Sequence, residues 1–180
     1  MNRVHLALLV LFAAVLVFDA SPRNPGSVLA PEVGGPTRVF GEQEIATQLR
    51  ELNPSLSPRQ LRRIAAAVVR YSAKYDLDPE LVAAVMRVES NARPWVRSPK
   101  GAMGLMQVMP HMIGPLDIAG NPSSIESNVE VGCMILADNI RRLGEHRGIS
   151  SYFWGSEIRG VSYLRQVQEA RAAVGRDAES

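Results

Sequence analysis

Glu89 is the residue whose type and setting point first to chemistry. It follows an apolar run in which Val82, Val85 and Glu89 recur at helical spacing, so its carboxyl is expected on a buried face. Burying a bare carboxylate is costly, and desolvation raises the pKa of an acid. A glutamate held in this way suits a general acid that works near neutral pH. No other acidic residue occurs from Ser90 to Leu116, so no sequence neighbour shares the role.

Glu89 and Gln107 each have a simpler, non-catalytic explanation. Glu89 could be a half-exposed residue at a helix end, paired with Arg87 or Arg93. The negative end of the helix dipole disfavours an acid there. Gln107 stands alone among apolar residues, and it is either a core amide or a hydrogen-bonding group that faces a ligand. The residues alone therefore indicate a helical domain with one candidate acid.

Composition excludes several classes of function. The formal net charge is +2 and the two signs are interspersed, so the pI of about 9.0 does not indicate nucleic-acid binding. Cys133 is the only cysteine, which rules out an intrachain disulfide and a Cys/His metal cluster. Its apolar neighbours predict a buried thiol and not a nucleophile. We expect no metal, no cofactor and no nucleic-acid partner.

Residues 1–20 are expected to be an export signal. Arg3 and His5 precede an unbroken apolar run that ends at Phe18 and is too short for a comfortable membrane span. Phe18 lies where a small residue is usual before cleavage, so an uncleaved anchor is the alternative and would be the one membrane attachment. Residues 21–56 are expected to be a Pro- and Gly-rich linker that ends in a short amphipathic helix at 42–52.

The folded domain is expected over residues 57–175, with a short tail at 176–180. Ser57 and Asp78 are predicted N-caps, because each is followed by a proline at the first helical position. Apolar residues at helical spacing continue both helices. No convincing alternating run predicts a strand, so we expect a mainly α fold with little or no β-sheet.

Further helices are predicted along the rest of the chain. A capping box at Ser127 begins a helix that stops at Gly144. Inside it, Gly132 costs stability unless a neighbour packs closely against it. The other segments expected to be helical are residues 102–109, 151–155 and 161–174.

Two blocks of this sequence carry a resemblance to a known family. The residues from Glu89 to Pro94 read ESNARP, and those from Gly101 to Pro110 read GAMGLMQVMP. At this spacing they resemble the signature of soluble-type lytic transglycosylases, lysozyme-like enzymes that cleave bacterial peptidoglycan. A following block is similar in the right order, at Asn121-Pro122, Asn128-Val129 and Gly132. The similarity spans about residues 57–167.

The resemblance implies a site and a reaction. Glu89 would act as catalytic acid and then as base, while Ser98, Met106, Gln107 and Tyr152 would line the sugar groove, with Tyr152 able to hydrogen-bond Glu89. The implied lyase-type reaction cleaves the β-1,4 bond between N-acetylmuramic acid and N-acetylglucosamine and leaves 1,6-anhydromuramoyl ends. One carboxylate suffices because the substrate's N-acetyl group stabilises the cationic centre and its own 6-hydroxyl attacks; ordinary glycosidases need two.

The chain also departs from the family's pattern. Met112 stands where threonine is usual, Ile135 where tyrosine is common, and Phe153 where the family has an asparagine. Phe153 and Trp154 either stack on sugars or pack in the core, and core packing is favoured. A second acid, such as Asp117, that folds into the site stays an open alternative.

The resemblance also implies a place and a role. We expect an exported protein of the bacterial periplasm or cell envelope whose partner is the glycan strand of peptidoglycan. One small domain without a separate wall-binding module predicts local wall opening for a secretion, conjugation or pilus apparatus. The alternatives are a hydrolytic lysozyme of the same fold and a non-catalytic peptidoglycan-binding assembly factor.

Overall fold

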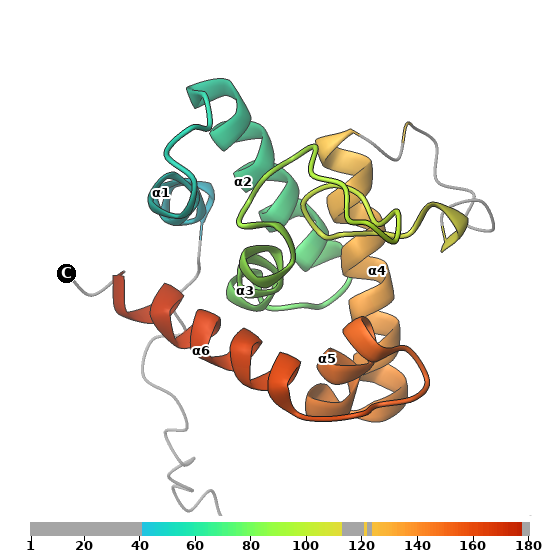
Figure 1. Cartoon of the computed structure of the whole chain (residues 1–180). Coiled ribbons are helices and arrows are strands. Elements are labelled where there is room, and N and C mark those ends of the chain that lie inside the picture. The colour runs from blue at the N-terminus through green and yellow to red at the C-terminus, as the bar shows by residue number, and fades with distance from the viewer. Residues whose placement is uncertain (1–40, 113–120, 122–123, 178–180) are drawn as a thin grey trace, which may run out of the picture. The chain divides into compact units, whose positions relative to one another are not determined.

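A computed structural model describes residues 41–112, 121 and 124–177 of the chain, all within the compact unit Arg38–Ser180 (Figure 1). The expected export signal and most of the expected linker lie outside these residues. In the described part, six α-helices and one short 3-10 helix account for the regular structure, with two isolated bridges in place of a sheet. The mainly α fold class is therefore confirmed. The elements are α1 Glu42–Leu52, α2 Pro58–Lys74, α3 Pro79–Ser90, η1 Pro110–Met112, α4 Ile125–Leu143, α5 Glu145–Trp154 and α6 Ser162–Asp177.

Side-chain N-caps determine where α2 and α3 start. The hydroxyl of Ser57 accepts a hydrogen bond from the backbone N–H of Gln60 at 3.3 Å, and the Gln60 side chain accepts one from the N–H of Ser57 at 2.8 Å. Asp78 accepts from the N–H of Glu80 at 3.0 Å. Both satisfy N–H groups that a helix start leaves without partners. The two predicted N-caps are confirmed, as is the short helix at 42–52.

Two helix starts were predicted wrongly. The N-cap of α4 is Ser124, whose hydroxyl accepts from the N–H of Ser127 at 3.2 Å, so Ser127 lies inside the helix. Helix α5 begins at Glu145, six residues before the predicted start at residue 151. Gly144 has φ 76°, a conformation that glycine adopts readily, and it ends α4 and starts α5 without a linker between them.

Residues 102–109 are not helical either. Met103 and Val108 exchange two backbone hydrogen bonds, each 3.0 Å long, which closes a tight turn between them. Gly104 and Gln107 both have positive φ inside this turn, at 76° and 48°. A right-handed helix excludes such angles, so the apolar pattern of this segment reflects a turn with buried side chains and not a helix face.

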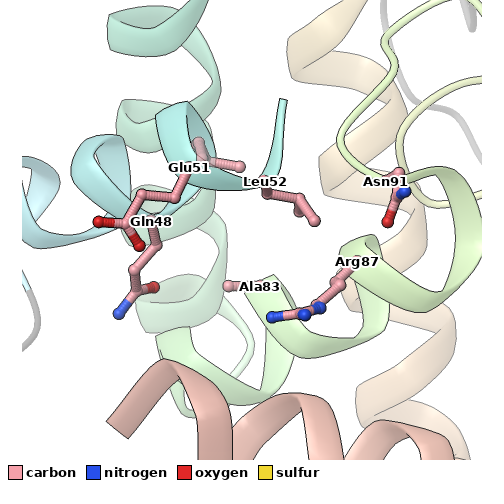
Figure 2. Close-up of a pocket in the computed structure, with 7 residues that line it drawn as sticks. Gln48, Glu51, Leu52, Ala83, Arg87 and Asn91 are labelled. Carbon is pink, nitrogen blue, oxygen red and sulfur yellow. The ribbon is translucent and has the colours of Figure 1, made fainter. Parts of the chain in front are cut away.

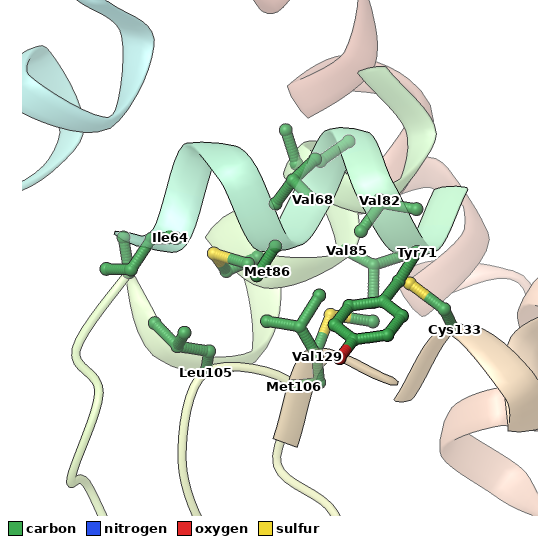
Figure 3. Packing of buried hydrophobic residues seen from close by; sticks show 14 of the residues in the cluster. Ile64, Val68, Tyr71, Val82, Val85, Met86, Leu105, Met106, Val129 and Cys133 are labelled. Carbon is green, nitrogen blue, oxygen red and sulfur yellow. The ribbon is translucent and has the colours of Figure 1, made fainter. Parts of the chain in front are cut away.

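Helix α3 lies at the centre of the packing. It contacts α1, α2 and α6, and in Figure 1 it is seen nearly end-on among them. Every residue from Leu81 to Met86 is buried. Figure 3 shows the side chains of α2 and α3 meeting Leu105, Met106 and residues of α4. The last turn of α3, which carries Glu89, is therefore held by a well-packed helix. None of the helices in the described part of the chain is both long and apolar enough to cross a membrane.

The loop after α3 is clamped onto α4. Asn128 accepts from the N–H of Met106 at 2.9 Å and donates to the carbonyl of Met103 at 2.8 Å. The Met106 side chain fills the space above Gly132, where an added Cβ would lie 2.5 Å from Met106 Cβ. Gly104 is similarly close to Asn128. A close neighbour of this kind is the condition under which the sequence predicts that a glycine inside this helix is tolerated.

This contact predicts a stability change. Gly132→Ala should lower the free energy of unfolding, because overpacking costs about 1–3 kcal/mol. That loss outweighs a gain in helix propensity of at most about 1 kcal/mol. Urea unfolding measures the difference. Gly160→Ala is the control, since nothing lies within 4 Å of a Cβ added there. A stabilised Gly132→Ala protein would contradict the packing described above.

Candidate functional site

Glu89 lies half-buried in the last turn of α3. The helix ends at Ser90, and its C-cap residue Asn91 adopts the left-handed conformation with φ 54°. The hydroxyl of Tyr163, in the first turn of α6, donates a hydrogen bond of 2.6 Å to Glu89 Oε1. Tyr163 is itself 4% exposed, so this bond is shielded from water on one side. The packing of α3 against α6 thus brings together two residues that are 74 positions apart.

Two opposing influences act on the pKa of Glu89. Burial raises the pKa above its ordinary value, and the hydrogen bond from Tyr163 lowers it by a smaller amount. Among the described residues, no arginine or lysine forms an ion pair with Glu89, and Arg93 instead donates to the carbonyl of Ser90. The alternative in which Arg87 or Arg93 neutralises Glu89 is therefore wrong for this structure.

Helix α6 is held in place by charges at its far end. Arg171 forms ion pairs with Asp78, at the start of α3, and with Glu145, at the start of α5. These contacts fix α6 against both helices, and partly buried arginine pairs of this kind favour one orientation. The position of Tyr163 relative to Glu89 follows from that orientation.

Tyr152 does not donate to Glu89 as expected. Its hydroxyl donates to the backbone carbonyl of Met106 at 2.8 Å. Burial, and then the nearby negative charge of Glu89, raise the pKa of Tyr152 well above its ordinary value, so the hydroxyl stays protonated. Tyr163 makes the bond that was expected of Tyr152. Nothing in the local sequence indicated Tyr163, because the bond depends on how two distant helices pack.

The other predicted site residues shape the loop beside Glu89. The amide of Gln107 donates to the carbonyls of Val96 at 3.2 Å and Gly104 at 3.0 Å. Ser98 accepts from the N–H of Ala102 at 3.0 Å. Met106 is a correction, because its side chain is 0% exposed and a buried side chain does not line a groove. Its carbonyl, which holds Tyr152, is the part that bears on the site.

Ser90 is a further residue that the sequence did not single out. Its buried hydroxyl donates to the carbonyl of Leu105 at 2.7 Å, which ties the end of α3 to the turn that contains Gln107. A buried hydroxyl needs such a partner. Its position directly after Glu89 was the one available signal.

The larger cavities described lie elsewhere. One of about 350 Å³ opens between α1 and α3, where Gln48, Arg87 and Asn91 are among the lining residues (Figure 2). Another of about 930 Å³ lies along α4 and η1. Neither is lined by Glu89. Asp117, the alternative second acid, falls outside the described residues.

Metal and thiol chemistry find no support at this site. In the part of the chain that the structure describes, no three His, Cys, Asp or Glu side chains come close enough to hold a metal ion. Burial raises the pKa of the Cys133 thiol far above its usual range, which keeps it protonated. The chemistry available is that of Glu89 and the two tyrosines.

Residues 67–169 match the model of the family described as the transglycosylase SLT domain, which covers more than half of the chain. The chain belongs to this family. The SLT domain thus includes Glu89, the clamped loop, Tyr152 and Tyr163.

Individual relatives agree with that assignment. The SLT chain is 36% identical over 96 residues to the transglycosylase of Enterobacteria phage PRD1, over 49% of this chain and 36% of that one. It is 30% identical over 112 residues to the membrane-bound lytic murein transglycosylase C of Sodalis glossinidius. The match covers 56% of this chain and 31% of that one. The chain thus spans only about a third of the length of these curated relatives. The 70 kDa soluble lytic transglycosylase of Escherichia coli aligns with TM-score 0.47 and 21% identity, over 74% of this chain and 28% of that one.

The hydrogen bond from Tyr163 predicts how a substitution there changes the pKa of Glu89. Tyr163→Phe should raise the pKa of Glu89 further, because the influence that lowers it is removed while burial remains. Carboxyl NMR shifts of labelled glutamate, followed against pH, measure this. Tyr152→Phe is the matched control, since its hydroxyl donates to Met106. Equal shifts in both variants would show that Tyr163 has no special bond to the acid.

Burial of Glu89 also predicts a pH-dependent stability. The folded-state pKa is raised, so stability falls as pH rises from the ordinary value through the folded value. Glu89→Gln removes the buried charge, and it should stabilise the protein near neutral pH and change little at about pH 4. Urea unfolding at both pH values tests this. Glu169→Gln, at an exposed position of α6, is the control. An equal increase in the free energy of unfolding at both pH values would contradict a raised pKa of Glu89 in the folded state.

Proposed function

We propose that this SLT protein is a peptidoglycan lytic transglycosylase with Glu89 as its single acid and base. The observation that carries the proposal is the setting of Glu89, which is half-buried, has a raised pKa and accepts one tyrosine hydrogen bond. No second carboxylate among the described residues contributes to that pKa. Membership of the family and the names of the phage and murein transglycosylases support the same reading.

The proposed reaction needs Glu89 in both protonation states. Protonated Glu89 gives its proton to the glycosidic oxygen, and the bond from that oxygen to C1 of N-acetylmuramic acid breaks. The N-acetyl carbonyl stabilises the cationic C1. The Glu89 carboxylate then takes the proton of the 6-hydroxyl while O6 bonds to C1, which closes the 1,6-anhydro ring. No water is consumed, and Glu89 ends protonated for the next cycle.

The two influences on the pKa of Glu89 suit these two steps. Burial favours the protonated acid that the first step requires. The hydrogen bond from Tyr163 stabilises the carboxylate that the first step leaves behind, and it fixes the carboxyl in place. An acid without this bond would protonate the leaving oxygen but would be less well placed to act as base.

We propose a supporting role for the other predicted residues. Ser98, Gln107 and Tyr152 hold the loop beside Glu89 through backbone carbonyls and N–H groups. Their direct contact with sugar stays a prediction. Rigid support of this kind keeps a reacting group within the small tolerance that catalysis requires.

The proposed setting is the bacterial envelope. The basic and apolar N-terminal sequence supports export, and peptidoglycan as substrate requires it. Local wall opening for a secretion, conjugation or pilus apparatus is the proposed role. Deletion of the gene should impair that apparatus and leave growth and chain separation intact. A general growth or separation defect would indicate broad wall turnover instead.

Digestion of purified sacculi by the whole chain tests the activity. Mass spectrometry should find anhydromuramoyl ends, lighter by one water than hydrolysed ends. Glu89→Gln should lower the rate by about 10²–10⁴-fold, the range for losing a general acid. Glu169→Gln is the control, and circular dichroism checks that both variants fold.

Each alternative function predicts a different outcome, in the digestion assay or in cells. Incorporation of heavy oxygen from labelled water into the product ends would identify a hydrolytic lysozyme. An unchanged biological effect of Glu89→Gln in cells would identify a non-catalytic binding or assembly factor. Anhydro ends that disappear with Glu89→Gln would leave the transglycosylase.

A further inference from the structure

Three aromatic rings meet beside Glu89. Phe153 and Tyr163 are stacked, with centroids 4.9 Å apart and planes 17° from parallel. Trp154 meets Phe153 edge-on, also at 4.9 Å and with planes at 90°. Phe153 and Trp154 end α5, and Tyr163 lies near the start of α6. The group therefore forms where these two helices come together.

Phe153 is the outer ring of this group. It is 56% exposed, whereas Tyr163 beneath it is 4% exposed. One face of Phe153 lies on Tyr163 and its ring is perpendicular to that of Trp154, so its exposed surface is the part of the ring that these two neighbours leave uncovered. The expectation that Phe153 packs in the core is therefore wrong. The rings of α5 and α6 already fill the space beneath it.

An exposed aromatic ring alone is ordinary, but its neighbours make this one informative. Phe153 covers Tyr163, and the hydroxyl of Tyr163 is 2.6 Å from Glu89. The exposed surface of Phe153 is therefore connected to the acid through one tyrosine side chain. A ligand that lies against Phe153 thus contacts a residue that packs directly on the hydrogen-bond partner of Glu89.

We propose that Phe153 forms a sugar-stacking subsite for one N-acetylated ring of a β-1,4-linked glycan beside Glu89. The inference rests on the proposed function, and it names a contact that orients the substrate. In such a sugar the ring substituents are equatorial, so both faces present C–H groups. The face of an aromatic ring is electron-rich and attracts these positively polarised hydrogens.

The support beneath Phe153 is rigid. Tyr152, directly before it, is anchored by its bond to the Met106 carbonyl. Ser151 donates to the carbonyl of Gly155 at 2.8 Å and closes the end of α5. The buried N–H of Trp154 has no acceptor in the described structure. An unsatisfied donor of this kind is costly, so its presence indicates that the position of the Trp154 ring is held by packing.

Binding can be measured without cleavage and with a built-in reporter. The chain has two tryptophans, so Trp95→Phe leaves Trp154, which contacts Phe153, as the one tryptophan, and excitation at a wavelength that tyrosine does not absorb reports on it alone. In a Trp95→Phe, Glu89→Gln chain, titration with tetra-N-acetylchitotetraose should change Trp154 emission. Adding Phe153→Ala should weaken binding about three- to tenfold, the range for one aromatic contact.

Two further variants separate stacking from simple apolar contact. Phe153→Tyr keeps a ring and should keep affinity within about twofold. Phe153→Leu keeps apolar bulk without a ring and should behave like the alanine variant. Equal affinity for the alanine, leucine and parent proteins would overturn the proposal. Circular dichroism on each variant confirms folding, which an exposed position should tolerate.

Turnover of sacculi distinguishes failure of the subsite from failure of the enzyme. Phe153→Ala in the otherwise native chain should raise KM about three- to tenfold and change kcat much less, because stacking holds ground and transition states alike. Anhydro products with an unchanged KM would overturn the subsite and leave the transglycosylase intact. Oligosaccharide binding that depends on Phe153, without any cleavage, would overturn the transglycosylase and leave the subsite.

Discussion

The cost of burying one carboxylate at the end of an apolar helix constrains the whole domain. Helix α3 is buried from Leu81 to Met86, and Glu89 comes at its C-terminal end, where the helix dipole disfavours negative charge. No described cation offsets this. A single hydrogen bond from Tyr163 reduces the penalty and leaves the pKa raised. A stronger partner such as arginine would have stabilised the fold at the expense of the acid.

The loop beside Glu89 is held from both sides by backbone contacts. Hydrogen bonds of its backbone with Asn128 and Ser90 attach the loop to α4 and α3, and the hydroxyl of Tyr152 in α5 donates to the Met106 carbonyl. Gly132 and the buried Met106 side chain allow the loop to approach α4 closely. The polar side chains in this segment therefore bond mainly to backbone groups, and the proposed chemistry would depend on the rigidity that results.

The aromatic group extends this arrangement outward. The hydroxyl of Tyr163 donates a hydrogen bond to Glu89, and its ring stacks on that of Phe153. One side chain therefore connects the acid to an exposed residue. Phe153 stands where the resembled family has an asparagine, and the structure turns that departure into an exposed apolar face. In the proposed subsite this residue changes what the edge of the site offers to a sugar, while the hydrogen bond from Tyr163 to Glu89 does not involve it.

Sequence patterns were sufficient to predict the helical class, the caps at Ser57 and Asp78 and the candidacy of Glu89. These depend on local hydrogen bonds, helical period and neighbours in sequence, all of which a pattern contains. Tertiary structure alone decided the partner of Glu89, the turn at 102–109 and the exposure of Phe153. Tyr163 reaches Glu89 because α6 packs on α3, and the turn exists because Asn128 and α4 hold it. Contacts between residues far apart in the chain leave no local period, so their energy overrides propensity without any sign in the sequence.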